Sequence, residues 1–121
     1  MEIIHESGYI YNDLKLHNIM LDNNVSIPKQ KQDPLRNIFR ENDLKLVDFG
    51  LASRWRDRKT GEHIVPSIAT MFRGNLYFSS VNQLKCMKPS RRDDLHSLAY
   101  LLLFMINEGL IPSIDSIFKK K

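Results

Sequence analysis

Hydrophobic positions gather most densely near the carboxyl end of the chain. The run 98–106 is wholly apolar and forms the second half of a helix predicted from about Ser90 to Asn107. Apolar residues along this helix recur at intervals of three and four residues, as expected for one helix face. Because its second half is apolar almost all round, we expect this helix to be buried on most sides. The main stripe consists of Leu95, Leu98, Ala99, Leu102 and Met105.

Shorter elements are predicted upstream. The opening residues resemble the end of a helix stopped by Gly8, since glycine readily takes the left-handed backbone found at helix ends. Two short apolar runs, 19–21 and 44–47, are bounded by polar residues and predict brief strands. The stretch 51–74 is loop-like, and 24–43 is polar and basic. These elements together predict an α+β fold.

Composition narrows the class of protein. The chain has 121 residues and a net charge of +4, enough for one small domain or part of a larger one. The apolar run is far shorter than the roughly 20 residues of a membrane span, and no membrane partner is expected. The basic clusters lack interleaved aromatic residues, so no nucleic-acid partner is expected either. With a lone cysteine and no signal-like start, we expect an intracellular, cytoplasmic location, with the nucleus as the alternative. Oligomeric state is left open.

The polar loop 11–18, Y-N-D-L-K-L-H-N, carries groups suited to phosphoryl transfer. A carboxylate at Asp13 can orient a hydroxyl and take its proton. An ammonium at Lys15 can neutralise charge on the moving phosphoryl group, and the amide of Asn18 can help to hold a metal ion. An ordinary turn is the alternative, because Asp and Asn favour turns for backbone reasons.

A second group of residues follows the strand predicted at 44–47. Asp48 stands at the end of this strand, and Phe49 and Gly50 follow it. A carboxylate so placed can chelate a Mg²⁺ ion that bridges nucleotide phosphates. D-F-G alone is weak evidence, but here it follows the D-x-K-x-x-N loop in the required order. The two together predict ATP and Mg²⁺ as cofactors.

In this order and spacing the chain resembles the protein kinase superfamily. Two later stretches, G-N-L-Y-F-S-S at 74–80 and S-R-R-D-D-L at 90–95, are similar to the casein kinase I family. The resemblance covers about 1–112, apart from a basic insertion near 24–43, and leaves 113–121 as a truncated tail. It implies a partial protein-kinase-like fold, mainly a helical C-terminal lobe with short strands flanking the catalytic loop and D-F-G.

The resemblance implies a serine/threonine kinase that phosphorylates protein substrates with ATP. Asp13 would be the base and Lys15 the cation that contacts the phosphoryl group and the nucleotide. Asn18 and Asp48 would bind the nucleotide and its Mg²⁺. Asp94, near the start of the long helix, is expected to hydrogen-bond the backbone of the catalytic loop, because a partly buried carboxylate there can fix it.

The chain departs from the family at several positions. Tyr11 and Asn12 replace the His-Arg that precedes the catalytic aspartate, so switching by activation-segment phosphorylation is not expected. Asn75 replaces the threonine that supports the catalytic aspartate and lysine, and its amide can both donate and accept. Tyr77 replaces an arginine that binds acidic substrates, although Arg73 lies nearby.

Other family features are absent from these 121 residues: the Gly-rich loop, the strand lysine and its partner glutamate. We therefore expect a fragment without the amino-terminal lobe that is inactive alone and exposes apolar surface. A non-catalytic pseudokinase-type binding module is the alternative. Small-molecule phosphotransferases share the D-x-x-x-x-N pattern, but D-F-G and the 90–95 stretch disfavour them. The substrate, the true start and the role of the insertion, with its helix candidate at 33–42, stay open.

Overall fold

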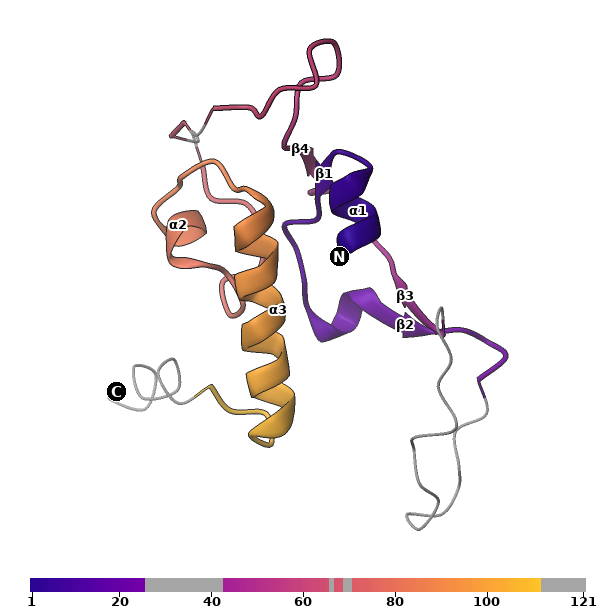
Figure 1. The fold of residues 1–121 in the computed structure, drawn as a ribbon. Helices are drawn as coiled ribbons and strands as arrows, with labels where there is room; N and C mark the ends of the chain where they lie inside the picture. The colour runs from indigo at the N-terminus through magenta and orange to yellow at the C-terminus, as the bar shows by residue number, and fades with distance from the viewer. Residues whose placement is uncertain (26–42, 66, 69–70, 112–121) are drawn as a thin grey trace. The chain divides into compact units, whose positions relative to one another are not determined.

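The computed structural model describes residues 1–25, 43–65, 67–68 and 71–111 (Figure 1). They belong to two compact units, which are described separately. The first comprises Met1–Lys15 and the described residues of Phe49–Lys121, and the second the described residues of Leu16–Asp48. The helix candidate at 33–42 and the tail 113–121 lie outside the described residues.

The first unit begins with the helix end predicted before Gly8. Helix α1 spans Glu2–Glu6, and Gly8 follows it with a φ of 88°. Strand β1, Tyr9–Ile10, then pairs antiparallel with β4, Ser53–Arg54, with Tyr9 opposite Arg54. Strand β4 was not predicted, because two polar residues carry no alternating pattern and their pairing with β1 orders them.

The second unit contains both of the short strands that the sequence predicted. A 3₁₀ turn, Leu16–Asn18, leads into β2, Ile19–Leu21, which pairs antiparallel with β3, Leu44–Leu46. Ile19 lies opposite Leu46 and Leu21 opposite Leu44. Residues just before β2 and just after β3 therefore share one end of this ladder.

Two further helices complete the first unit. Helix α3, Arg91–Ile106, matches the predicted long helix to within a residue. Helix α2, Val81–Leu84, was not predicted and lies beside the first turns of α3 (Figure 1). A reciprocal pair of hydrogen bonds stabilises its start. The Ser80 hydroxyl accepts from the Gln83 amide at 3.2 Å, and the Gln83 side chain accepts from the Ser80 amide at 3.0 Å.

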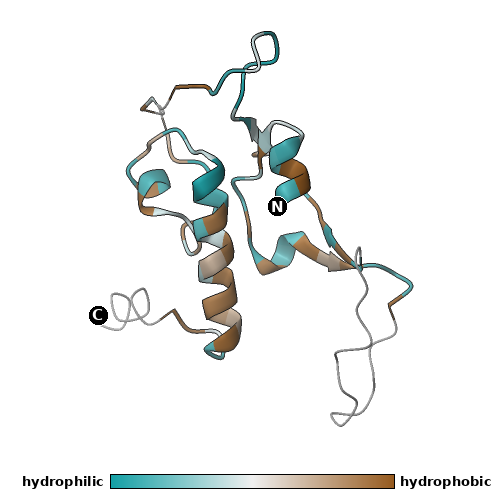
Figure 2. Ribbon diagram, viewed as in Figure 1, coloured by the Kyte–Doolittle hydropathy of each residue, from teal (hydrophilic) through white to brown (hydrophobic). Residues whose placement is uncertain are grey.

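The expectation that α3 would be buried on most sides is wrong for this chain, whereas the exposed apolar surface expected of a fragment is observed. Its first turn is hydrophilic and its second half hydrophobic (Figure 2). In that half Leu101 is buried, but most neighbouring apolar side chains are exposed, because the described residues pack against only one face. No helix in the described part of the chain combines the length and apolar character needed to cross a membrane. The buried apolar residues are Ile10, Tyr11, Leu14, Phe78, Leu101 and Ile111.

Candidate active site

The first turn of α3 binds the backbone of residues 11–15, hereafter the 11–15 loop. This loop is the part of the predicted catalytic loop that lies in the first unit. The Asp94 carboxylate accepts hydrogen bonds from the backbone amides of Tyr11 and Asn12, each at 2.8 Å. The oxygen that binds Tyr11 also lies 2.8 Å from Nε2 of His5, on α1. Asp94 is only 2% exposed. One carboxylate therefore fixes two successive peptide groups immediately before Asp13.

Asp13 and Lys15 lie on this loop as a direct ion pair. Lys15 Nζ donates to Asp13 Oδ2 at 2.6 Å. The Asp13 side chain is nearly buried and the Lys15 side chain is partly exposed. Partial burial weakens solvent screening, so the ammonium strongly orients the carboxylate. The two charged groups predicted for the reacting end of the site are therefore brought together.

The residue after Asp48 packs on the same loop. The rings of Phe49 and Tyr11 meet edge to face, with centroids 5.2 Å apart and planes at 79°. Tyr11 is fully buried and Phe49 is half exposed. This geometry is a favourable one for an aromatic pair. The D-F-G phenylalanine is thus in contact with the first residue of the 11–15 loop.

Gly74 also approaches the 11–15 loop closely. Its φ is 122°, and a Cβ at this position would lie 2.7 Å from the Asn12 carbonyl oxygen. Nε2 of Gln83 donates to the same carbonyl at 3.4 Å. The next residue, Asn75, accepts at Oδ1 from the backbone amides of two residues in its own turn, at 2.8 and 3.3 Å. Its side-chain oxygen is therefore engaged locally, which leaves the NH₂ group as the part that could support Asp13.

Tyr77 belongs to an aromatic cluster. Its ring meets those of Phe78 and Phe104 edge to face, with centroids 5.2 and 5.6 Å away. The rings of Phe78 and Phe104 lie 5.4 Å apart. The cluster joins the 74–80 stretch to the second half of α3. Packing therefore accounts for an aromatic residue at this position.

Asp93 links α2 to α3. One of its oxygens accepts from the Ser80 hydroxyl at 2.6 Å, and the other accepts from the Ser90 backbone amide at 2.7 Å. Burial raises the pKa of Asp93, but the hydrogen bonds from Ser80 and Ser90 outweigh burial, so its pKa lies below the ordinary value. The carboxylate is ionised and holds the two helix starts together.

Asn18 and Asp48 lie at one end of the ladder in the second unit. Asn18 directly precedes β2, and Asp48 follows β3 by two residues. The Val47 backbone amide donates to the Asn18 carbonyl at 3.0 Å, which extends the pairing to this end. Asp48 adopts a φ of 60°, so the chain turns at this residue. Amide and carboxylate oxygens are ligands that Mg²⁺ accepts, so these residues fit a magnesium site. Within the described ranges, no group of three or more His, Cys, Asp or Glu side chains could hold a metal.

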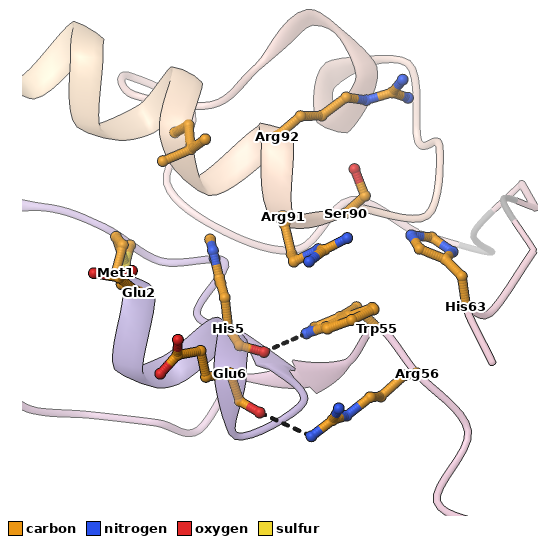
Figure 3. Close-up of a pocket in the computed structure, with 11 residues that line it drawn as sticks. Met1, Glu2, His5, Glu6, Trp55, Arg56, His63, Ser90, Arg91 and Arg92 are labelled. Atoms are coloured by element: carbon orange, nitrogen blue, oxygen red, sulfur yellow. Dashed lines mark hydrogen bonds between the residues drawn. The ribbon is translucent and has the colours of Figure 1, made fainter. Parts of the chain in front are cut away.

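An open pocket of about 1050 Å³ lies elsewhere in the first unit, between α1, the segment after β4 and the start of α3 (Figure 3). Trp55 Nε1 donates to the His5 carbonyl at 2.7 Å, and the Arg91 guanidinium lies 3.7 Å from the Trp55 ring centroid. Arg56 donates to the Glu6 carbonyl at 2.8 Å. None of the residues predicted for catalysis lines this pocket. The pocket therefore lies where α1, the segment after β4 and the start of α3 meet, apart from the residues predicted for catalysis.

Sequence reasoning missed several residues that support the site. His5 gave no signal, because a lone histidine near a helix end has many uses. Ser80 and Gln83 form an S-x-x-Q pattern, which is a capping signature and could have revealed α2. The roles assigned to Asp13, Lys15 and the other predicted site residues stay predictions. The structure adds the contacts of these residues within each unit, such as the Asp13–Lys15 ion pair.

Comparisons with known proteins give a consistent family. The family model described as protein kinase domain matches residues 1–119. The chain is also similar to casein kinase 1-like protein HD16 of Oryza sativa subsp. japonica. The two are 35% identical over 113 residues, which cover 93% of this chain and 14% of that protein. The chain thus spans a small part of the length of this relative.

Proposed function

The chain belongs to the protein kinase family and is casein kinase I-like, and on this premise we propose that it carries the phosphoryl-transfer residues of a serine/threonine protein kinase. The observation that carries the proposal is the Asp13–Lys15 ion pair, on a loop whose two preceding amides are bound by Asp94. A pre-set carboxylate and cation are what a positioned phosphoryl transfer needs from the protein.

In this proposal Asp13 accepts the proton of a substrate serine or threonine hydroxyl. The hydroxyl oxygen then bonds to the terminal phosphorus of ATP while the bond to the leaving ADP oxygen breaks. The Lys15 ammonium neutralises negative charge on the group in transit. Asn18 and Asp48 would hold Mg²⁺, which supplies further charge neutralisation when bound with the nucleotide phosphates.

We further propose that the chain corresponds to the C-terminal lobe of the kinase fold. The long helix with a loop bound to its first turn, and the short strands beside the catalytic loop and D-F-G, support this assignment. An amino-terminal lobe would then be needed to cover the nucleotide. Its absence from these 121 residues is the reason to expect no transfer by this chain alone.

The test adds the amino-terminal lobe of a casein kinase I to this chain and measures phosphoryl transfer from ATP. We expect Mg²⁺-dependent transfer to a casein-like protein and none to choline or aminoglycosides. Asp13→Asn should lower the rate by roughly 10²- to 10⁴-fold, because it removes the proton acceptor. Asp22→Asn is the matched control, since Asp22 is not among the predicted site residues and accepts from the Asn24 backbone amide in an exposed turn.

A non-catalytic binding module is the second candidate function. The local engagement of the Asn75 oxygen favours it, because the support expected for Asp13 and Lys15 is then reduced. If the extended protein binds Mg²⁺ and ATP but transfers nothing, and Asp13→Asn changes nothing, this second candidate replaces the first.

A further inference from the structure

The Asn12 side chain connects the 11–15 loop to the segment that follows Gly50. Its Nδ2 donates to the Leu51 carbonyl at 2.8 Å and to the Ser53 hydroxyl at 2.8 Å. Asn12 is buried, and its backbone amide is bound by Asp94. One residue therefore ties three parts of the first unit together: the loop, the start of α3 and the segment 51–53.

The orientation of the Asn12 amide follows from its partners. The Leu51 carbonyl can only accept, so the NH₂ group and not the oxygen must face it. Oδ1 is left buried without a partner among the described residues. Such an acceptor carries a desolvation cost, and it is tolerated here because the opposite orientation would place Oδ1 against the Leu51 carbonyl oxygen. The bond to Leu51 therefore determines how the side chain lies, and the Ser53 hydroxyl accepts from the same NH₂ group.

These connections are neutral. Amide, carbonyl and hydroxyl groups form them, and no charge is needed on either side. The first cations after this segment in the sequence bind elsewhere, since Arg54 donates to the Tyr9 hydroxyl at 2.7 Å and Arg56 to the Glu6 carbonyl. Asn12 itself adopts a φ of 69°, a left-handed conformation that asparagine adopts more readily than most residues.

We infer that Asn12 is a positioning residue whose side-chain amide holds the segment 51–53 against the 11–15 loop without help from a bound anion. We call this pair of bonds the Asn12 clasp. Phe49 stands two residues before Leu51, so the clasp also limits the movement of Phe49 against Tyr11. The inference rests on the proposed function only in assigning a catalytic role to the 11–15 loop. Its own test uses no phosphoryl transfer.

The test is amide hydrogen exchange of the 121-residue chain, with the side-chain NH₂ of Asn12 followed by nuclear magnetic resonance. The backbone amides of Ala52 and Trp55 report opening of the segment, because they bind Phe49 and Gly8. Asn12→Ala should speed their exchange by roughly 10- to 30-fold, since two hydrogen bonds are lost. Ser53→Ala removes one bond, so about a five-fold increase is expected there, together with a shift of the Asn12 NH₂ resonances.

Ser7→Ala is the matched control, because the Ser7 hydroxyl also donates to a carbonyl, that of Ile3, in the same unit. It should leave the exchange of Ala52 and Trp55 unchanged. Combining Asn12→Ala with Ser53→Ala should add nothing to Asn12→Ala alone. Additive effects in the double variant would overturn the clasp. Equal exchange in the wild type and in Ser53→Ala would also overturn it, and this result can be obtained even if Asn12→Ala does not fold.

Inorganic phosphate tests the neutral character of the clasp. Wild-type exchange at Ala52 and Trp55 should be the same with and without phosphate at constant ionic strength. Slower exchange when phosphate is added would show that an anion completes the contact, and the inference would be wrong. A failure of the kinase assay would leave these results intact, so the two proposals fail separately.

Discussion

The first turn of α3 buries two carboxylates, whereas the second half of the same helix exposes most of its apolar side chains. Asp93 and Asp94 are at most 2% exposed, and Ile106 is 80% exposed. At the polar end, every approaching segment brings a donor: backbone amides, serine hydroxyls and a histidine. At the apolar end, the described residues offer packing to one face only.

Burial at the polar end of α3 is determined by the hydrogen-bond donors that surround its carboxylates. Burial at the apolar end is determined by how much apolar surface from other segments packs against it. A buried carboxylate is costly unless its oxygens are bound, and here both are bound at each aspartate. An apolar side chain needs only neighbouring surface, and the described residues cover most of these side chains incompletely. Four substitutions test this contrast.

Asp94→Ala should have the largest effect. It leaves the amides of Tyr11 and Asn12 buried without an acceptor, so we expect a loss of about 3–5 kcal/mol in the free energy of unfolding. Urea denaturation measures it. Asp57→Ala is the control, because Asp57 accepts from two backbone amides at an exposed turn. Equal midpoints for the two variants would contradict the importance of the polar end.

Gly74→Ala should come next. The new Cβ would meet the Asn12 carbonyl at 2.7 Å, and alanine disfavours a positive φ. We expect a loss of about 2 kcal/mol, measured by the same denaturation. At Gly61 the φ is also positive, but the space around it is open. Gly61→Ala should therefore cost about 1 kcal/mol, from the backbone alone. If both cost the same, the close approach to the loop has no energetic weight.

Asp93→Asn should change how stability depends on pH. The folded state lowers the pKa of Asp93, so its ionised form stabilises the fold above the unfolded pKa. That contribution is lost as the pH falls through about 4 and below, toward the folded pKa. The wild type should therefore lose more unfolding free energy on acidification than Asp93→Asn does. Parallel pH curves would show that Ser80 and Ser90 do not hold a charged group.

Leu103→Gln should have the smallest effect on stability. Leu103 is exposed, so we expect a change within about 0.5 kcal/mol in unfolding free energy. Light scattering should decrease, because an exposed apolar patch promotes association. Leu101→Gln is the matched contrast, since this leucine is 1% exposed and its replacement buries an amide. An equally large loss in both variants would mean that Leu103 is buried after all.

Much of this fold could be predicted where a local pattern carries the signal. Helix α3, strands β2 and β3 and the helix end at Gly8 follow from periodicity and breaker residues. Strand β4 could not be predicted, because a two-residue strand exists only through its partner. The long helix was predicted correctly, but the extent of its burial was not. Periodicity shows which positions are apolar, whereas burial depends on which other segments pack against them.

For the candidate site, spacing identified the groups but not how they are held. Asp13 and Lys15 were chosen for their chemistry, and the structure adds the ion pair between them. The contacts of His5 with Asp94 and of Asn12 with Ser53 join residues far apart in sequence. A single sequence gives no signal for such pairs, because each residue alone has many ordinary uses.

Trp55 allows the contact between α1, the segment after β4 and α3 to be observed without any added label. It is the only tryptophan of the chain, and its indole is tied to α1 through the His5 carbonyl and covered by Arg91 of α3. Separation of either helix would bring water to the indole and shift its fluorescence to longer wavelengths. The chain thus contains its own optical reporter for the assembly of α1, the segment after β4 and α3.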